Sequence, residues 1–245
     1  MRIALLGYGK MGHEVEAAAL AQGHEVVAVV DDAAGASRGS VGDAEVAIDF
    51  TTPDSALPNI LGVSSLGVDL VVGTTGWYNR LEEARAAVEK AGTGLVWAPN
   101  FSLGVQLFLR LARRAGELAD ALDEYDVAVH EVHHRHKVDH PSGTAIRLAD
   151  VLVDAIARKR SWAEGPHDGA PDPNVLWVSS SRAGEVPGTH VVSLEGPDDG
   201  IELRHTARGR SGFARGAVAA AGWIRGRKGF FGIDDMLSER FGARG

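Results

Sequence analysis

The sequence predicts an α/β protein in which a doubly wound parallel sheet is interrupted by a second, mixed α/β domain. Short apolar runs alternate with stretches of helical periodicity from residue 3 to residue 97, which is the pattern of repeated strand–helix units. Beyond residue 103 most of the strands are separated by Gly, Pro and Asp turns instead. A helix of small residues at 213–224 then suits packing on the first sheet. We therefore expect one domain at 1–103 and 214–245 and an inserted domain at 104–213.

Composition narrows the functional classes. The chain has 245 residues, 44% of them apolar and 24% charged, which is enough for two domains with cores of their own. It has no cysteine, which excludes disulfides, thiolate metal sites and cysteine nucleophiles. A net charge of −8 argues against nucleic acid as the main partner. The N-terminus leads directly into a glycine motif and no segment resembles a membrane span, so we expect a cytoplasmic protein without a membrane partner.

The first strand, expected at Ile3–Leu6, leads into a glycine turn with G-x-G-x-x-G spacing and then a helix, and the next strand, Glu25–Val30, ends in acidic residues. In this context the motif predicts a dinucleotide site. Its glycines allow a tight turn, close approach of the pyrophosphate and close helix packing, and the helix N-terminus attracts phosphate. The alternative is a purely structural glycine turn. The predicted cofactor contacts in this turn are Gly7, Tyr8, Gly9, Lys10, Met11 and Gly12.

Two carboxylates follow the second strand. Asp31 is expected to accept hydrogen bonds from the ribose hydroxyls of the cofactor and to repel a 2′-phosphate. Asp32 adds a second negative charge where an arginine would otherwise bind that phosphate, although it could also simply cap a turn. We therefore predict NADH as the favoured cofactor, with NADPH as the alternative, since Lys10 or Arg38 could offset part of the repulsion.

Three further strands are expected at 45–50, 68–72 and 94–97, with helices around 56–66 and 81–90 between them. Ligands of a doubly wound sheet bind at the carboxyl ends of its strands, and small polar turns follow the second and third of these three. We predict that these turns contact the nicotinamide riboside, although plain loops would have the same composition. The predicted contacts are Gly73, Thr74, Thr75, Ala98, Pro99, Asn100 and Phe101.

The inserted domain is expected to begin with a helix at 105–121 and a strand at 125–134. A helix starts at Ala145 and ends near residues 158–160, a loop rich in Pro and Gly covers 162–174, and strands follow at 175–182, 189–195 and 200–207. Between the first strand and the second helix lies the densest group of ionisable side chains. Residues 130–144 contain five of the ten histidines of the chain.

Alternation along the strand places Glu131 and His133 on one face. Where the strand ends, His134, His136 and Lys137 can surround one pocket beside the start of the next helix, whose amides suit a carboxylate. Histidine transfers protons near neutral pH and lysine binds carboxylates, so this pocket suits a small dianion. One alternative is a zinc site built from the five histidines, whose spacing matches none of the common zinc signatures. Another is a solvated histidine-rich turn. We predict no metal.

The segment from Glu131 to Thr144 resembles the signature E-x-H-H-x-x-K-x-D-x-P-S-G-T of the 4-hydroxy-tetrahydrodipicolinate reductase family, also called dihydrodipicolinate reductases. The resemblance implies a Rossmann-type cofactor domain, an inserted mixed α/β domain for substrate binding and tetramerisation, and a homotetramer. The glycine turn is one residue shorter than the common family form G-A-x-G-[RK]-M-G. Further motifs in the family's order are Gly73–Gly76, Ala98–Ser102, Ser181–Gly184, Gly188–His190 and Phe213–Ala217.

The resemblance also implies an activity and roles for the residues of the cluster. The activity is reduction of 4-hydroxy-tetrahydrodipicolinate, a small dicarboxylate, to tetrahydrodipicolinate with loss of water, in the diaminopimelate route to lysine. His133 is then the general acid/base, Lys137 its partner in protonation and carboxylate binding, and His134 a ligand of a substrate carboxylate. Alternatives are a reductase of another small dicarboxylate and a dinucleotide-binding sensor without turnover. The carboxylate site at the helix start consists of Ser142, Gly143 and Thr144.

Overall fold

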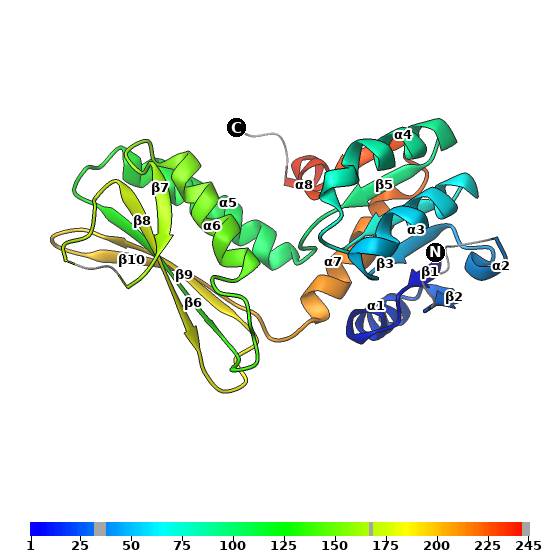
Figure 1. The fold of residues 1–245 in the computed structure, drawn as a ribbon, viewed down its shortest axis with the longest axis horizontal. Coiled ribbons are helices and arrows are strands. Elements are labelled where there is room, and N and C mark those ends of the chain that lie inside the picture. Colours follow the sequence, from blue (N-terminus) through cyan, green and yellow to red (C-terminus); the bar gives the residue numbers. More distant parts are fainter. Residues whose placement is uncertain (32–37, 167–168, 242–245) are drawn as a thin grey trace. The chain divides into compact units, whose positions relative to one another are not determined.

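The chain folds into two compact units in the computed structural model, which describes residues 1–31, 38–166 and 169–241. One unit consists of Met1–Ser102 and Arg210–Gly245, and the other of Leu103–Gly209. The second unit is therefore inserted into the chain of the first (Figure 1). The predicted fold class is confirmed, because the first unit contains a parallel sheet with flanking helices and the second a mixed sheet.

The sheet of the first unit has six parallel strands in the order β11-β5-β4-β3-β1-β2. The chain order reverses between β1 and β3, and dinucleotides bind at such switch points. All residues of β3 and β4 are buried, as expected for strands that are covered on both faces. The strands are β1 (Arg2–Leu6), β2 (Glu25–Val30), β3 (Val46–Asp49), β4 (Asp69–Val72), β5 (Gly94–Trp97) and β11 (Gly229–Gly232).

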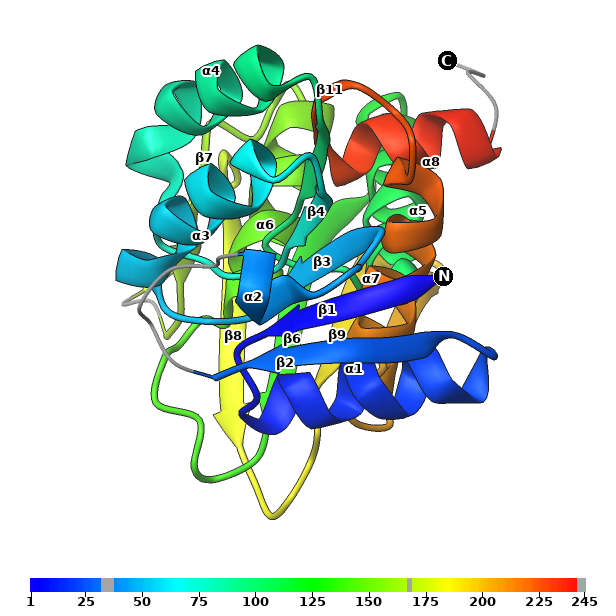
Figure 2. The same ribbon diagram turned by 90° about the vertical axis from the view of Figure 1, so that its right-hand side faces the viewer.

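Helices cover both faces of this sheet (Figure 2). On one face α3 contacts α4, and on the other α1 contacts α7. The small-residue helix α7 contacts β3, β4 and β5, which confirms that it packs on the first sheet. Its buried alanines and the buried Gly216 allow this close approach. The helices are α1 (Lys10–Ala21), α2 (Arg38–Val41), α3 (Pro53–Ser65), the 3₁₀ helix η1 (Tyr78–Arg80), α4 (Leu81–Ala91), α7 (Ser211–Ile224) and α8 (Ile233–Phe241).

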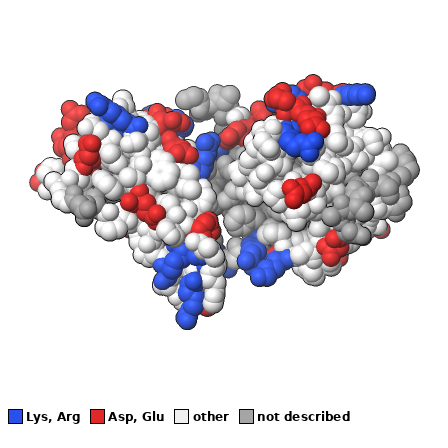
Figure 3. Space-filling model, viewed as in Figure 1, with Lys and Arg blue, Asp and Glu red and all other residues white. Residues whose placement is uncertain are grey.

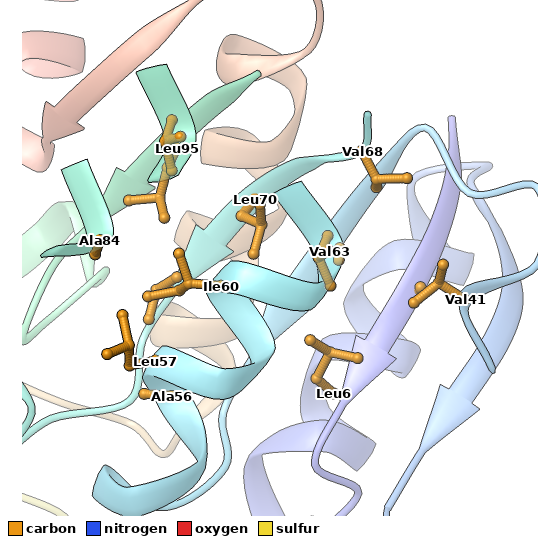
Figure 4. Packing of buried hydrophobic residues seen from close by; sticks show 14 of the residues in the cluster. Leu6, Val41, Ala56, Leu57, Ile60, Val63, Val68, Leu70, Ala84 and Leu95 are labelled. Carbon is orange, nitrogen blue, oxygen red and sulfur yellow. The ribbon is translucent and has the colours of Figure 1, made fainter. Parts of the chain in front are cut away.

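An aliphatic core lies between α3 and the sheet (Figure 4). Leu57, Ile60 and Val63 occupy one side of α3 at helical spacing and pack with Leu6 and Leu70 from the strands. Each of these side chains is at most 1% exposed. Burial of one such side chain contributes about 1.5–3 kcal/mol to the stability of the folded state. This core therefore holds the carboxyl ends of the strands in place.

The second unit has a five-stranded mixed sheet in the order β10-β9-β6-β8-β7. Its central strand β6 runs parallel to β8 and antiparallel to β9. Buried residues alternate along β6 as predicted, and those of its buried face pack with α5 and α6. The elements are α5 (Leu103–Asp120), β6 (Asp126–His133), α6 (Gly143–Ala155), β7 (Ser161–Glu164), β8 (Val175–Arg182), β9 (Thr189–Glu195) and β10 (Gly200–Thr206).

Two local predictions for this unit are wrong. Helix α6 ends at Ala155, before residues 158–160, because Ile156 takes an extended conformation and is fully buried. Strand β7 overlaps the predicted loop at 162–174. It pairs in parallel with β8, and the Trp162 indole N–H donates to Asp150 Oδ1 at 2.9 Å. Both differences arise from tertiary contacts, which the local residue composition does not reveal.

Candidate active site

The glycine turn after β1 has a shape that admits a dinucleotide. Gly7 has φ +83°, and a Cβ added there would overlap the carbonyl of Phe50, while one added at Gly12 would overlap the carbonyl of Gly7. Gly9, the N-cap of α1, differs, because a Cβ there would meet no atom within 4 Å and no side chain caps the helix. Open space therefore lies beside the N-terminus of α1, where a pyrophosphate can approach the backbone.

The carboxylate that follows β2 is tied to this turn. Asp31 is exposed and accepts a hydrogen bond from the backbone N–H of Tyr8 at 2.8 Å. Its carboxylate therefore lies beside the glycine turn, as a ribose-binding acid requires. Asp32 lies outside the described residues, as does the side chain of Arg38. The other predicted residues of the turn are the exposed Lys10 and the half-buried Met11.

A buried carboxylate that we did not predict organises the turn after β4. Asp49, at the end of β3, is fully buried and accepts hydrogen bonds from Thr74 Oγ1 at 2.6 Å, Thr51 Oγ1 at 2.8 Å and Asn59 Nδ2 at 2.8 Å. Burial raises the pKa of Asp49, and these donors oppose the rise. The Gly73–Thr75 turn is therefore held rigidly, with Thr74 buried against Asp49 and the neighbouring Thr75 exposed.

The turn after β5 has a buried part and an accessible part. Ala98 and Phe101 are each 1% exposed, and the Phe101 carbonyl lies against Gly216 of α7. Pro99 is exposed, and the half-buried Asn100 accepts a hydrogen bond from the Ser102 amide at 2.8 Å. Pro99 and Asn100 therefore provide the accessible surface of this turn, whereas Ala98 and Phe101 fix it in the core.

Strand β6 brings Glu131 and His133 to one buried face, where Glu131 Oε2 contacts His133 Nδ1. Glu131 is fully buried and His133 is 8% exposed. The second oxygen, Oε1, lies 2.9 Å from Arg182 Nη2 and accepts a hydrogen bond from the Ser142 amide at 3.3 Å. The pair therefore joins the end of β8 to the start of α6, and it forms the centre of the candidate site.

The charges around this pair determine its protonation. Burial disfavours ionised Glu131, but the hydrogen bond from Arg182 and the charge of His133 outweigh burial and hold the pKa of Glu131 below its usual value. Burial also lowers the pKa of His133, which Glu131 opposes and Lys137 reinforces. The His190 ring centroid lies 5.2 Å from that of His133, and burial lowers the pKa of His190 to about 4. His190 is therefore neutral near pH 7.

A basic loop follows β6. Arg182 anchors it by donating hydrogen bonds to the carbonyls of Lys137 at 3.2 Å and Asp139 at 2.6 Å. The Lys137 ammonium lies 2.8 Å from Asp139 Oδ1, and this bond lowers the pKa of Asp139. His134 is half-buried at the start of the loop. Figure 3 shows basic side chains gathered at the end of the second unit where β6 and β8 stop. This end of the unit suits an anionic ligand.

The predicted carboxylate site coincides with the start of α6. Ser142 is the N-cap, and its hydroxyl accepts from the Ala145 amide at 3.2 Å and bonds His190 Nε2 at 3.1 Å. The Ser142 hydroxyl is thus satisfied inside the protein. Gly143 is exposed, a Cβ there would meet nothing within 4 Å, and Thr144 is half-buried. The surface that an anion can approach is therefore formed by Gly143 and Thr144.

Three of the five histidines of the cluster lie apart from the Glu131–His133 pair. His136 and His140 are exposed, with 69% and 65% of their side-chain surfaces accessible. Each of the three pairs elsewhere: His130 with Ser179 at 2.8 Å, His136 with Glu185 at 3.6 Å and His140 with Glu164 at 3.2 Å. The structure therefore does not gather the five imidazoles around one point.

Strand pairing adds residues that we did not assign to the site. The register places His190 of β9 opposite Glu131, and Arg182 of β8 opposite His133. Gly188 precedes β9, and a Cβ added there would lie 2.8 Å from His133 Nε2. The motifs Ser181–Gly184 and Gly188–His190 were the sequence signal for these residues, but they did not show what the residues contact.

A metal triad is geometrically feasible at this site. One ligand atom each from Glu131, His133 and His190 lies within 4.8 Å of the others. However, Glu131 already pairs with Arg182, and this guanidinium would repel a second cation. We therefore assign the three side chains to hydrogen bonding. Within the described ranges, no helix combines the length and apolar character that a membrane span requires.

Comparisons of this chain with family models and with known proteins indicate the same family. Residues 1–101 match the sequence model "Dihydrodipicolinate reductase, N-terminus", and residues 104–237 match "Dihydrodipicolinate reductase, C-terminus". The 4-hydroxy-tetrahydrodipicolinate reductase of Christiangramia forsetii is 37% identical, with 98% of this chain and 99% of that protein covered. The enzyme of the same name from Alkalilimnicola ehrlichii is 38% identical, with 96% of this chain and 98% of that protein covered.

A solved structure shares the fold over nearly the whole chain. Dipicolinate-bound dihydrodipicolinate reductase from Paenisporosarcina sp. TG-14 superposes with a TM-score of 0.77 and covers 97% of this chain and 99% of its own. Its sequence identity is 23%, so this likeness concerns the architecture alone. The family models, the relatives and this solved structure thus all indicate the same family name for proteins that share the sequence or the fold of this chain.

Proposed function

Because this chain belongs to the dihydrodipicolinate reductase family, a family of NAD(P)H-dependent oxidoreductases, we propose that it reduces 4-hydroxy-tetrahydrodipicolinate to tetrahydrodipicolinate with loss of water. This reaction belongs to the diaminopimelate route to lysine. The observation that carries the proposal is the buried Glu131–His133 pair beside the start of α6 and a basic loop. Such a pocket combines a proton donor with groups that bind a carboxylate.

In the proposed reaction a reduced nicotinamide, held by the glycine turn and the turns after β4 and β5, would supply a hydride to the C4 region of the cyclic imine. His133 donates the proton that completes the reduction, from the nitrogen opposite its contact with Glu131. Lys137 assists by holding negative charge beside the reacting ring. The overall change consumes one NAD(P)H and one proton and releases one water. The residues of the chain orient the substrate and supply the proton, and the cofactor supplies the electrons.

The two carboxylates of the substrate need two anion sites. We assign one to the N-terminus of α6, where Gly143 is exposed and Ser142 fixes the first turn through its cap. Thr144 contributes to the same site. The other carboxylate is assigned to His134 and Lys137 on the basic loop, which Arg182 holds in place. A planar dicarboxylate such as dipicolinate, which is bound in the Paenisporosarcina structure, should then compete with the substrate.

We assign the cofactor to the glycine turn and to the turns after β4 and β5, with NADH favoured over NADPH. The support is Asp31, whose carboxylate is exposed beside the glycine turn and would repel a 2′-phosphate. Replacing Asp31 with asparagine should therefore bring the affinities for NADPH and NADH closer together. Isothermal titration with each cofactor measures the two affinities, and an unchanged ratio would mean that another residue discriminates between them.

We also propose that the enzyme is a cytoplasmic homotetramer. Helices α5 and α6 pack on the face of β6 that carries its buried residues, whereas residues on the opposite face, such as Ala128 and His130, are exposed or half-buried. Such an uncovered sheet face suits association with further copies of the chain. Light scattering coupled to size exclusion measures the mass in solution, and a monomer at micromolar concentration would contradict this part of the proposal.

The reaction itself is tested by following oxidation of NADH with enzymatically generated substrate. We expect turnover, competition by dipicolinate, and a loss of about 10²-fold or more in kcat for His133→Ala and Lys137→Ala. His140→Ala is the matched control, because His140 lies in the same segment but is exposed and pairs with Glu164. A chain that binds NADH without oxidising it would instead be a sensor, and the proposal would fail.

A further inference from the structure

We propose that Glu131 is a positioning residue that fixes the tautomer of His133 and links this proton donor to the carboxylate site at the start of α6. The inference deepens the proposed function, because it takes His133 as the acid of that reaction. It concerns a carboxylate that is fully buried. Glu131 acts through His133 on one side and through the backbone of Ser142 on the other.

The contacts of the Glu131 carboxylate define this role. A carboxylate only accepts hydrogen bonds, so the nitrogen of His133 that contacts Oε2 must carry a proton. In the neutral imidazole that proton lies on Nδ1, which leaves Nε2 without one. When the ring is protonated, the proton that it can give away is therefore the one on Nε2. Glu131 thus determines which nitrogen faces the reaction.

The space beside Nε2 agrees with this assignment. Gly188 lies next to Nε2, and even a methyl group there would come within 2.8 Å of the nitrogen. Gly188 has φ +146°, a conformation that other residues rarely adopt. Glycine therefore keeps side-chain atoms away from this nitrogen, whereas the Nδ1 side of the ring is occupied by Glu131. The ring is thus held by Glu131 on one side, and a residue without a side chain lies against the other.

The second oxygen of Glu131 connects the acid to the carboxylate site. Oε1 accepts from the Ser142 amide at 3.3 Å, and Ser142 is the N-cap of α6. The same oxygen pairs with Arg182 at 2.9 Å, which keeps the carboxylate charged although it is fully buried. A substrate carboxylate at the helix start and the proton on Nε2 are thereby placed relative to one shared group. This fixed spacing is what a proton donor to a bound dicarboxylate requires.

The charge of Glu131 also affects when His133 carries its proton. Glu131 raises the pKa of His133 against the effects of burial and of the neighbouring cations. Without Glu131 the pKa of His133 falls further, and the protonated, active form disappears at a lower pH. The other titratable or charged groups that act on His133 are Arg182 of β8, His190 of β9 and Lys137 of the loop after β6.

The first test replaces Glu131 with glutamine, which keeps the shape but can donate to Nδ1 and so favour the other tautomer. We expect kcat to fall roughly 100-fold, the alkaline decline of kcat/KM to move to lower pH, and the KM for NADH to stay unchanged. Glu131→Asp retains the charge and should recover part of the rate. The control is Glu185→Gln, an exposed carboxylate beside His136. Wild-type turnover and pH profile in Glu131→Gln would overturn the inference.

The second test needs no variant and covers the case in which Glu131→Gln does not fold. Nitrogen-15 NMR of histidine-labelled wild-type protein distinguishes the two tautomers of neutral His133, and His133→Gln identifies its signals. We expect the proton on Nδ1, and a proton on Nε2 overturns the inference. Failure of the proposed function would appear differently, as a wild-type protein that does not oxidise NADH with the dicarboxylate substrate.

Discussion

Replacing Gly188 with alanine should lower the turnover of the enzyme by displacing the His133 ring. The added Cβ would lie 2.8 Å from Nε2 and 3.1 Å from Cδ2 of His133, closer than such atoms normally approach. The ring cannot turn aside freely, because Glu131 holds its other edge and Arg182 holds Glu131. The imidazole must shift, and the methyl group occupies the space beside the reacting nitrogen. Because a misplacement of about 1 Å can cost about 10²-fold in rate, we expect kcat to fall roughly 100-fold.

Gly184→Ala is the matched control for this variant. Gly184 lies on the same β8–β9 connection and also has a positive φ, +48°, but a Cβ there would meet nothing within 4 Å. Both variants carry backbone strain of about 1–3 kcal/mol, which at 2–4 °C per kcal/mol lowers the melting temperature by roughly 2–12 °C. Only Gly188→Ala should lose turnover in the NADH oxidation assay. An equal loss in both variants, or wild-type turnover in Gly188→Ala, would refute the reasoning.

Two further predictions concern stability. Burial lowers the pKa of His190 to about 4 in the folded state, so below about pH 6.5 the unfolded state binds more protons than the folded state. The free energy of unfolding should therefore fall as the pH drops from about 6.5 toward 4, by up to roughly 3 kcal/mol. Urea unfolding at about pH 7 and pH 5 measures this difference in the free energy of unfolding, which should be smaller for His190→Gln than for the wild type. An equal difference in the two proteins would contradict this prediction. Asp49→Ala removes the hydrogen-bond acceptor of Thr74 and its neighbours, so it should lower the free energy of unfolding by about 2–4 kcal/mol. It should also weaken NADH binding, as measured by titration calorimetry. The control is Asp43→Ala, at an exposed carboxylate paired with Arg2, which should change neither the free energy of unfolding nor the affinity for NADH.

Most of the first unit could be predicted from the sequence because its strands are short apolar runs between helices of clear periodicity. The exceptions are α2, η1, β11 and α8. Strand β11 is only Gly229–Gly232, and glycine at both ends makes it resemble a turn. It becomes a strand because it pairs in parallel with β5 at the edge of the sheet. Pairing with a distant partner is a tertiary effect that local residue preferences do not reveal.

The candidate site could be predicted only in part, for a related reason. His133, His134 and Lys137 lie in one short segment, so their spacing and chemistry are visible in the sequence. Arg182 and His190 reach the same place through strand register, which depends on which strands pair. Glu131 was visible in the signature, but its role depends on its contact with Arg182, so the sequence suggested only that it faces the same side as His133.

Asp49 and Glu131 are the least exposed charged side chains among the described residues of their units, and both lie close to predicted ligand contacts. A buried carboxylate is costly unless neighbouring donors satisfy it, and each of these two collects donors from other elements of its own unit. Each also holds a residue with a proposed ligand role, Thr74 in one case and His133 in the other. Mobile groups would lose much of their effect on a bound ligand, because positioning must precede the reaction. The cost of burying these charges is therefore explained better by the rigidity that they give to the site than by the stability of the fold.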